Sequence, residues 1–266
     1  MGRKAGLMGL PLHAALGGQM PVQRTVERLI ALGYAFCYDA VVRGFRPYEA
    51  MLDEIVRLIE RSRAAGSTAP VRVLDVSCGV GTAAARLARA GHAVVGIDAV
   101  ERLVAVARAS GRAGGGRVSF HHVDVAGDPI PGRGTYDVVV SMHTLYWHPQ
   151  PEAVLQACRR ALKPGGHGVF LTYARPAHIV QTFREVRAAE GLAAGIRALR
   201  WLVPTAIFEA LRACEHRYLS EDEFHAALAR AGFEVLESRQ TFLAGLSRLA
   251  WARARTDADP GVASDS

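Results

Sequence analysis

The chain has few cysteines, and they do not form a motif. Its four cysteines are Cys37, Cys78, Cys158 and Cys214, and none of their spacings is typical of a metal site or a redox pair. Scattered cysteines of this kind are usual in proteins of reducing compartments. The cysteines therefore favour a cytoplasmic protein and exclude a cysteine-based metal or redox site.

Long uncharged apolar runs are also missing. No such run reaches roughly 18 residues, the length at which a membrane-spanning helix becomes a candidate, so we expect no membrane span. Half of the residues (50%) are nevertheless hydrophobic, which excludes a disordered chain. The length of 266 residues suits one α/β domain with additional segments.

Lysine occurs only at Lys4 and Lys163, so the formal net charge of +7 comes almost entirely from arginines. These arginines are spread through the expected helices, where alanine and glutamate residues separate them. Basic patches with interleaved aromatic residues, which are typical of single-strand binding, are not evident. We interpret the charge as solvated helix faces and expect no nucleic-acid partner.

The most informative stretch is residues 71–84, VRVLDVSCGVGTAA. A buried-strand pattern leads through Asp75 and Ser77 into a turn with Gly79 and Gly81, and a helical pattern begins at Thr82. Glycines let the backbone bend sharply and let a ligand approach it, while the start of a helix presents unpaired N–H groups. We expect a nucleotide-like ligand at this turn.

The same stretch satisfies a second pattern. Gly79, Gly81 and Ala84 match the dinucleotide fingerprint, with Asp98 at the end of the next strand placed to bind ribose hydroxyls. Asp75 argues against a dinucleotide, because its carboxylate would repel a pyrophosphate and would favour a ligand with a positive amino group. A nicotinamide dehydrogenase is therefore the rival interpretation at the level of the fold.

DVSCGVG resembles the first motif of class I S-adenosylmethionine-dependent methyltransferases, usually D/E-x-G-x-G-x-G, with Ser77 in place of the first glycine. Residues 136–166, YDVVVSMHTLYWHPQPEAVLQACRRALKPGG, resemble a second family segment, which ends in L-K-P-G-G. The resemblance covers residues 71–173. It implies S-adenosyl-L-methionine as the cofactor and S-adenosyl-L-homocysteine as the product.

Short hydrophobic runs alternate with helical patterns through residues 71–173, which predicts a doubly wound parallel sheet. With the resemblance, the expected fold is α/β: a mostly parallel seven-stranded, Rossmann-like methyltransferase sheet. The expected regions are an N-terminal helical lid (1–66), a cofactor-binding core (67–173), a helical substrate-lid insertion (174–219), a terminal helix with an antiparallel hairpin (220–254) and a disordered tail (255–266).

The resemblance also implies cofactor-binding roles residue by residue. Asp98 matches the acid that binds both ribose hydroxyls. Asp124 matches the acid that accepts from the adenine amino group, with Val125 beside it against the ring. Ser141 takes the position whose backbone carbonyl receives the cofactor's amino group. The complete expected set is Asp75, Ser77, Gly79, Gly81, Asp98, Asp124, Val125 and Ser141.

Methyl transfer from a sulfonium is an in-line displacement, so the enzyme mainly aligns the two reacting groups. An oxygen or carbon acid acceptor would benefit from a base. His143 and His148 are the candidates for this base and Tyr146 for orienting the acceptor, while a hydrogen-bonding or structural role for His143 stays open. A metal-dependent catechol enzyme would want carboxylates near Ser141, so we expect no metal.

Aromatic residues of the expected lids are candidates to line the acceptor site. By resemblance these are Tyr34, Tyr38 and Tyr48 in the N-terminal lid, with Trp201 and Phe208 in the apolar insertion. Packing of the two lids against each other and the core is the alternative. Contact of the insertion with a membrane surface is a further interpretation.

The expected function is S-adenosylmethionine-dependent methyl transfer to an apolar or aromatic small molecule, at O, C or N, in quinone or secondary metabolism. The motif N/D-P-P-Y/F and a Pro-Cys pair are both missing, which argues against methylation of DNA bases. An RNA or protein methyltransferase and a non-catalytic cofactor-binding module are the alternatives. The expected partner is the small-molecule acceptor, and a homodimer stays open.

Overall fold

The computed structural model describes residue 42 and residues 44–63, 66–111, 117–211 and 218–256. Tyr34 and Tyr38, most of the expected N-terminal lid and most of the expected tail lie outside these residues.

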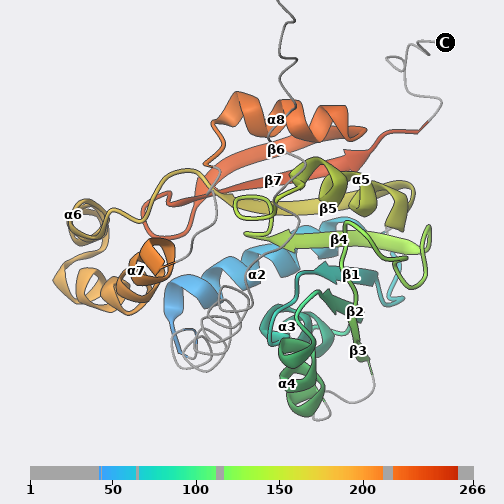
Figure 1. Cartoon of the computed structure of the whole chain (residues 1–266), viewed down its shortest axis with the longest axis horizontal. Helices are drawn as coiled ribbons and strands as arrows, with labels where there is room; N and C mark the ends of the chain where they lie inside the picture. Colours follow the sequence, from blue (N-terminus) through green and yellow to red (C-terminus); the bar gives the residue numbers. More distant parts are fainter. Residues whose placement is uncertain (1–41, 43, 64–65, 112–116, 212–217, 257–266) are drawn as a thin grey trace, which may run out of the picture.

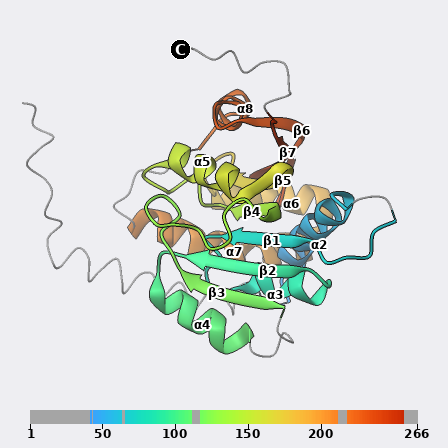
Figure 2. The same ribbon diagram turned by 90° about the vertical axis from the view of Figure 1, so that its right-hand side faces the viewer.

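A seven-stranded sheet forms the centre of the molecule, in the order β3-β2-β1-β4-β5-β7-β6 (Figures 1 and 2). The strands β3, β2, β1, β4 and β5 run parallel to one another, whereas β7 runs antiparallel to both β5 and β6. This confirms the predicted sheet and its terminal hairpin. The strands are β1 (Arg72–Val76), β2 (Ala93–Asp98), β3 (Val118–His122), β4 (Tyr136–Met142), β5 (Leu162–Tyr173), β6 (Phe233–Thr241) and β7 (Ser247–Ala254).

Helices follow the strands and cover both faces of the sheet. The helices are α2 (Arg46–Arg61), α3 (Thr82–Arg89), α4 (Glu101–Gly111), α5 (Pro151–Ala161), α6 (Ile179–Glu190), α7 (Leu192–Leu211) and α8 (Glu221–Arg230). One core cluster joins α2, α3, α4 and α7 to the sheet. The other joins α5 and α8 to it. No described helix is long and apolar enough to cross a membrane.

Helices α6 and α7 form a helical hairpin between β5 and α8 in the sequence, where the insertion is expected. They lie side by side beyond one end of β5 and β7 (Figure 1). The carboxyl end of β5 leads into α6 through residues 174–178, so the helical hairpin stands next to the edge of the sheet at which parallel strands end.

Strand β5 begins earlier than its pattern suggests. The residues KPGG suggest a turn before the strand, yet Leu162 already pairs with Tyr136, and the register shifts before His167 pairs with Val138. A Cβ atom on Gly166 would lie 3.0 Å from the carbonyl oxygen of Lys163 and 3.1 Å from that of Asp137. The glycine therefore lets the chain bulge close to its own backbone without leaving the sheet.

Candidate active site

The register of the sheet brings the ends of three neighbouring strands together. Val76 at the end of β1 pairs with Ile97 of β2 and with Ser141 of β4. Asp75, Asp98 and Ser141 therefore lie at the carboxyl edge of adjacent strands, where ligands bind in open α/β sheets.

The turn after β1 needs residues that accept a left-handed backbone. Its φ angles are 57° at Ser77, 56° at Gly79 and 80° at Gly81. A Cβ atom at Gly81 would lie 2.6 Å from Cζ of Phe120, whereas one at Gly79 would meet nothing within 4 Å. Gly81 thus lets the start of α3 pack against β3, and Gly79 leaves open space for a ligand.

Asp75 is buried at the start of α3. It is 1% exposed, the backbone N–H of Ala84 donates to its carboxylate, and its Oδ2 atom has no hydrogen-bond partner in the described part of the chain. Burial raises the pKa of Asp75 to about 7, the Ala84 amide lowers it, and the charge of Asp98 raises it. A positive ligand group beside Asp75 would favour the carboxylate, whereas a phosphate would be repelled.

Asp98 connects the glycine turn to α4. Its Oδ2 accepts from the backbone N–H of Gly79 at 2.9 Å, and its Oδ1 accepts from that of Val100 at 2.8 Å. Burial raises the pKa of the carboxyl group, and the amides of Val100 and Gly79 lower it. The side chain is therefore held in a fixed orientation at the carboxyl end of β2.

Asp124 and Val125 follow β3 but face different surroundings. Asp124 is exposed, and its Oδ1 accepts from the N–H of Ala126 at 3.0 Å, while its own N–H donates to Asp128 Oδ2 at 2.8 Å. Val125 is buried in the core cluster beneath α5 and α8. The turn at Asp124 thus presents a carboxylate to solvent while Val125 anchors it.

His143 and Tyr146, in the segment after β4, converge on Tyr173 at the end of β5. The His143 ring stacks on Tyr173 with centroids 4.1 Å apart, and Tyr146 meets the same ring edge-on at 4.7 Å. His143 Nε2 lies 2.9 Å from Ser247 Oγ. Burial lowers the pKa of His143 to about 3, so its imidazole is neutral at pH 7.

His148 and His143 contact different residues. Its Nδ1 accepts from the backbone N–H of Gln150 at 3.0 Å. Burial lowers the pKa of His148, and the charge of Asp124 raises it. The structure therefore places His148 towards the end of β3 and His143 towards β7, and the two histidines do not form a pair.

The aromatic residues expected in the lids contact each other. Tyr48 of α2 stacks on Trp201 of α7 with ring centroids 5.9 Å apart, and the Phe45 ring also stacks on Trp201, with centroids 6.2 Å apart. Tyr48 and Trp201 are both 3% exposed. These rings therefore hold α2 against the helical hairpin. Phe208 belongs to α7.

Sequence reasoning missed Tyr173 and Ser247. Tyr173 ends a strand at the same edge as Asp98, so extending the strand-end rule to β5 would have found it. Ser247 begins β7 and meets His143 only through the antiparallel pairing of Tyr173 with Ser247. No local pattern in the sequence predicts the contact between His143 and Ser247.

Within the described ranges, no group of three or more His, Cys, Asp or Glu residues could hold a metal ion. Asp98 and Asp124 accept hydrogen bonds from backbone amides.

Comparison with known proteins gives one family match. The sequence profile of a family described as a methyltransferase domain matches residues 42–238. A ubiquinone biosynthesis O-methyltransferase of Bordetella avium (strain 197N) is 37% identical over 131 residues, which cover 49% of this chain and 54% of that protein. The chain thus spans about half the length of the curated relatives it matches.

Two solved structures share the fold at low sequence identity. Magnesium protoporphyrin IX methyltransferase from Synechocystis PCC 6803, with bound SAH, aligns with a TM-score of 0.61 and 16% identity over 88% of this chain and 99% of that chain. The 1,6-didemethyltoxoflavin-N1-methyltransferase of Burkholderia thailandensis aligns with a TM-score of 0.58 and 17% identity over 91% and 94% of the two chains.

Proposed function

The chain belongs to the methyltransferase domain family, and from this premise we propose that it transfers a methyl group from S-adenosyl-L-methionine to an apolar or aromatic small molecule. A phenolic or quinol hydroxyl is the proposed acceptor. The names of the curated relatives, ubiquinone biosynthesis O-methyltransferases, support an oxygen acceptor of this class. Methyl transfer leaves S-adenosyl-L-homocysteine as the product, and the scattered cysteines favour the cytoplasm as the compartment.

Asp75 carries the cofactor proposal. Its carboxyl group is buried, with one oxygen free of protein partners in the described residues, next to a turn that is open at Gly79. A sulfonium cofactor brings a positive amino group to this edge of the sheet, and such a group compensates a buried carboxylate. We assign the ribose hydroxyls to Asp98, the adenine amino group to Asp124 and the amino group also to the backbone carbonyl of Ser141.

The acceptor is assigned to the aromatic edge formed by His143, Tyr146 and Tyr173. Because the His143 imidazole is neutral and held by Ser247, it is suited to accept a hydrogen bond from an acceptor hydroxyl and orient it. Tyr146 is 5% and Tyr173 4% exposed, so these rings keep water away from the His143 imidazole. His148 keeps its Nε2 atom available and is the second candidate to accept the proton.

Calorimetric titration with S-adenosylmethionine, S-adenosylhomocysteine and NADH tests the cofactor. We expect the first two to bind and NADH not to bind. Binding of NADH alone would overturn the proposal. Methyl transfer from labelled cofactor is then measured with phenols, quinols and amines, and transfer only to RNA or protein would refute the acceptor class.

The role of His143 is tested by His143→Ala. We expect turnover to fall by about 10- to 100-fold with cofactor affinity preserved, since the histidine acts on the acceptor. Because its pKa lies far below neutral, the wild-type rate should show no inflection from His143 between about pH 5 and pH 8. A full-rate variant removes His143 from the mechanism.

A further inference from the structure

The helical hairpin of α6 and α7 exposes much of the accessible large apolar surface of the described residues. Five large apolar side chains on it are between 39% and 63% exposed. We call them the hairpin face: Val180, Leu192, Ile196, Val203 and Ile207. Apolar side chains gathered on one element mark an interaction surface more strongly than scattered ones do.

The α7 members of the hairpin face lie on one side of the helix. Leu192, Ile196, Val203 and Ile207 follow at intervals of four, seven and four residues, which return to the same side at 3.6 residues per turn. Trp201 and its neighbours on the opposite side are buried against the core. The helix is thus apolar on two sides, and only one of them is used by the fold.

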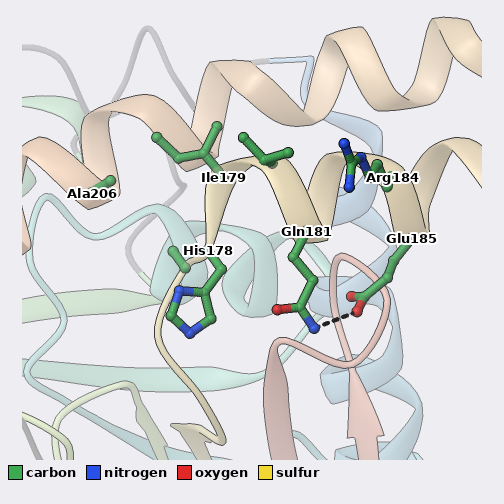
Figure 3. A pocket seen from close by; sticks show the side chains of 8 residues that line it. His178, Ile179, Gln181, Arg184, Glu185 and Ala206 are labelled. Atoms are coloured by element: carbon green, nitrogen blue, oxygen red, sulfur yellow. Dashed lines mark hydrogen bonds between the residues drawn. The ribbon is translucent and has the colours of Figure 1, made fainter.

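A groove between the two helices continues this surface to α6. It measures about 700 Å³ and is lined by Ile179, Val180 and Arg184 of α6 and by Ala206 of α7 (Figure 3). Ala206 lies one helical turn after Val203, so the groove borders the α7 stripe. His178, Gln181 and Glu185 also line the groove, so apolar and polar side chains share it.

Exposed arginines lie on the same two helices as the hairpin face. Arg184 and Arg187 of α6 and Arg197 of α7 are exposed. The carboxylate of Glu185, on the same helix, is engaged by Arg175 and by Gln181. Glu190 at the end of α6 is exposed as well, so the hairpin face has these three exposed arginines and one exposed glutamate beside it, an excess of positive charge.

We propose that the hairpin face docks on the surface of an anionic phospholipid bilayer. Aliphatic side chains enter the boundary between headgroups and acyl chains, while arginines beside them bind anionic headgroups. A second copy of the chain fits the charges less well, because a two-fold contact would bring the same arginines against each other. This inference goes beyond the proposed function and concerns the exposed side of α7, opposite the buried Trp201.

Co-sedimentation of the full chain with vesicles tests the proposal. Vesicles of phosphatidylcholine alone are compared with vesicles that also contain phosphatidylglycerol, at low and at high salt. We expect binding to the anionic vesicles, weakened by salt because the arginines are screened. Absence of binding to anionic vesicles would overturn the proposal, as would equal binding to both kinds of vesicle.

Two double variants separate the apolar and the charged contributions. Ile196→Gln with Ile207→Gln should lower the bound fraction at least about tenfold, because two aliphatic side chains no longer enter the bilayer. Arg184→Gln with Arg197→Gln should lower affinity for the anionic vesicles by about fivefold per arginine. Val106→Gln on α4 and Leu236→Gln on β6, exposed apolar positions elsewhere, are matched controls that should bind like the wild type.

Other occupants give different results. A dimer of the wild type that the isoleucine double variant dissociates, seen by analytical ultracentrifugation, would identify a second copy as the occupant and overturn the proposal. A marked drop in the thermal unfolding temperature of that variant would show that a segment of this chain covers the face, and would also overturn it. Neither measurement involves methyl transfer, so this test is independent of the proposed function.

Discussion

Ser77 lies in the turn after β1, at a position where the backbone is left-handed. It stands where the resembling motif usually has glycine, and its φ of 57° is in the left-handed region. A residue with a Cβ atom is strained there, whereas glycine is not. The left-handed backbone explains why the motif usually has glycine at this position. In this chain the serine is accommodated with local backbone strain.

Replacing Ser77 by glycine should therefore stabilise the fold. We expect Ser77→Gly to raise the free energy of unfolding by up to about 1 kcal/mol, the relief of strain being partly offset by the greater freedom of glycine in the unfolded chain. Urea denaturation measures the change. Ala105→Gly, at an exposed position in the middle of α4, should destabilise by about 0.5 to 1 kcal/mol. Destabilisation by both substitutions would contradict the strain argument.

Asp98 should contribute strongly to cofactor affinity if it binds the ribose. We expect Asp98→Asn to weaken binding of S-adenosylhomocysteine by roughly 10- to 100-fold, because charge-assisted hydrogen bonds to the hydroxyls are lost. The amides of Gly79 and Val100 bind different oxygens of Asp98, so asparagine keeps one of these two hydrogen bonds and places its NH2 group against the other amide. Calorimetry measures the affinity, with Asp222→Asn at the exposed start of α8 as the control. An unchanged affinity in both variants would remove Asp98 from the site.

At the scale of elements, α8 is the helix whose start follows most directly from the sequence. Ser220 Oγ accepts from the N–H of Glu223, and the Glu223 carboxylate accepts from the N–H of Ser220 at 2.8 Å. Both bonds are local, so the pattern S-E-D-E predicts them without knowledge of the fold. The start of β5 is the opposite case, because its early pairing depends on how β4 lies beside it.

Loss of this capping box should destabilise the protein without affecting the cofactor. We expect Ser220→Ala to lower the free energy of unfolding by about 1 kcal/mol, since the amide of Glu223 loses its partner at the helix start. Chemical denaturation measures this loss, and Glu223→Gln, which keeps a hydrogen-bonding oxygen, should cost less. A change in cofactor affinity equal to that of Asp98→Asn would show that α8 is coupled to the site.

At the scale of the whole molecule, two buried groups give opposite pH dependences of stability. Burial raises the pKa of Asp75 from 3.8 to about 7, so the folded protein holds a proton that the unfolded chain has released. Its contribution to stability therefore falls as pH rises through that window. Burial lowers the pKa of His143 from 6.5 to about 3, so its contribution falls as pH decreases from 6.5. Between about pH 3.8 and pH 6.5, the contributions of Asp75 and His143 to stability therefore change in opposite directions.

Removing one of the two groups should reveal the other. We expect the stability of Asp75→Asn to increase more steeply with pH than that of the wild type between about pH 4.5 and pH 6.5, by up to about 1.4 kcal/mol per pH unit. Urea denaturation at several pH values measures the slope for both proteins. A difference in stability between them that is independent of pH would show that the pKa of Asp75 is not raised in the folded state.

The sequence by itself determined the alternation of strands and helices, the glycine turn and the acids at the strand ends. These features depend on hydrophobic periodicity, on turn chemistry and on neighbours within a few residues. Only the tertiary structure decided that His143 meets Ser247 and Tyr173, that Tyr48 and Trp201 pack together, and that α7 leaves an apolar side exposed. Those contacts join residues far apart in the chain, and whether an apolar side chain faces the core or solvent depends on what packs against it.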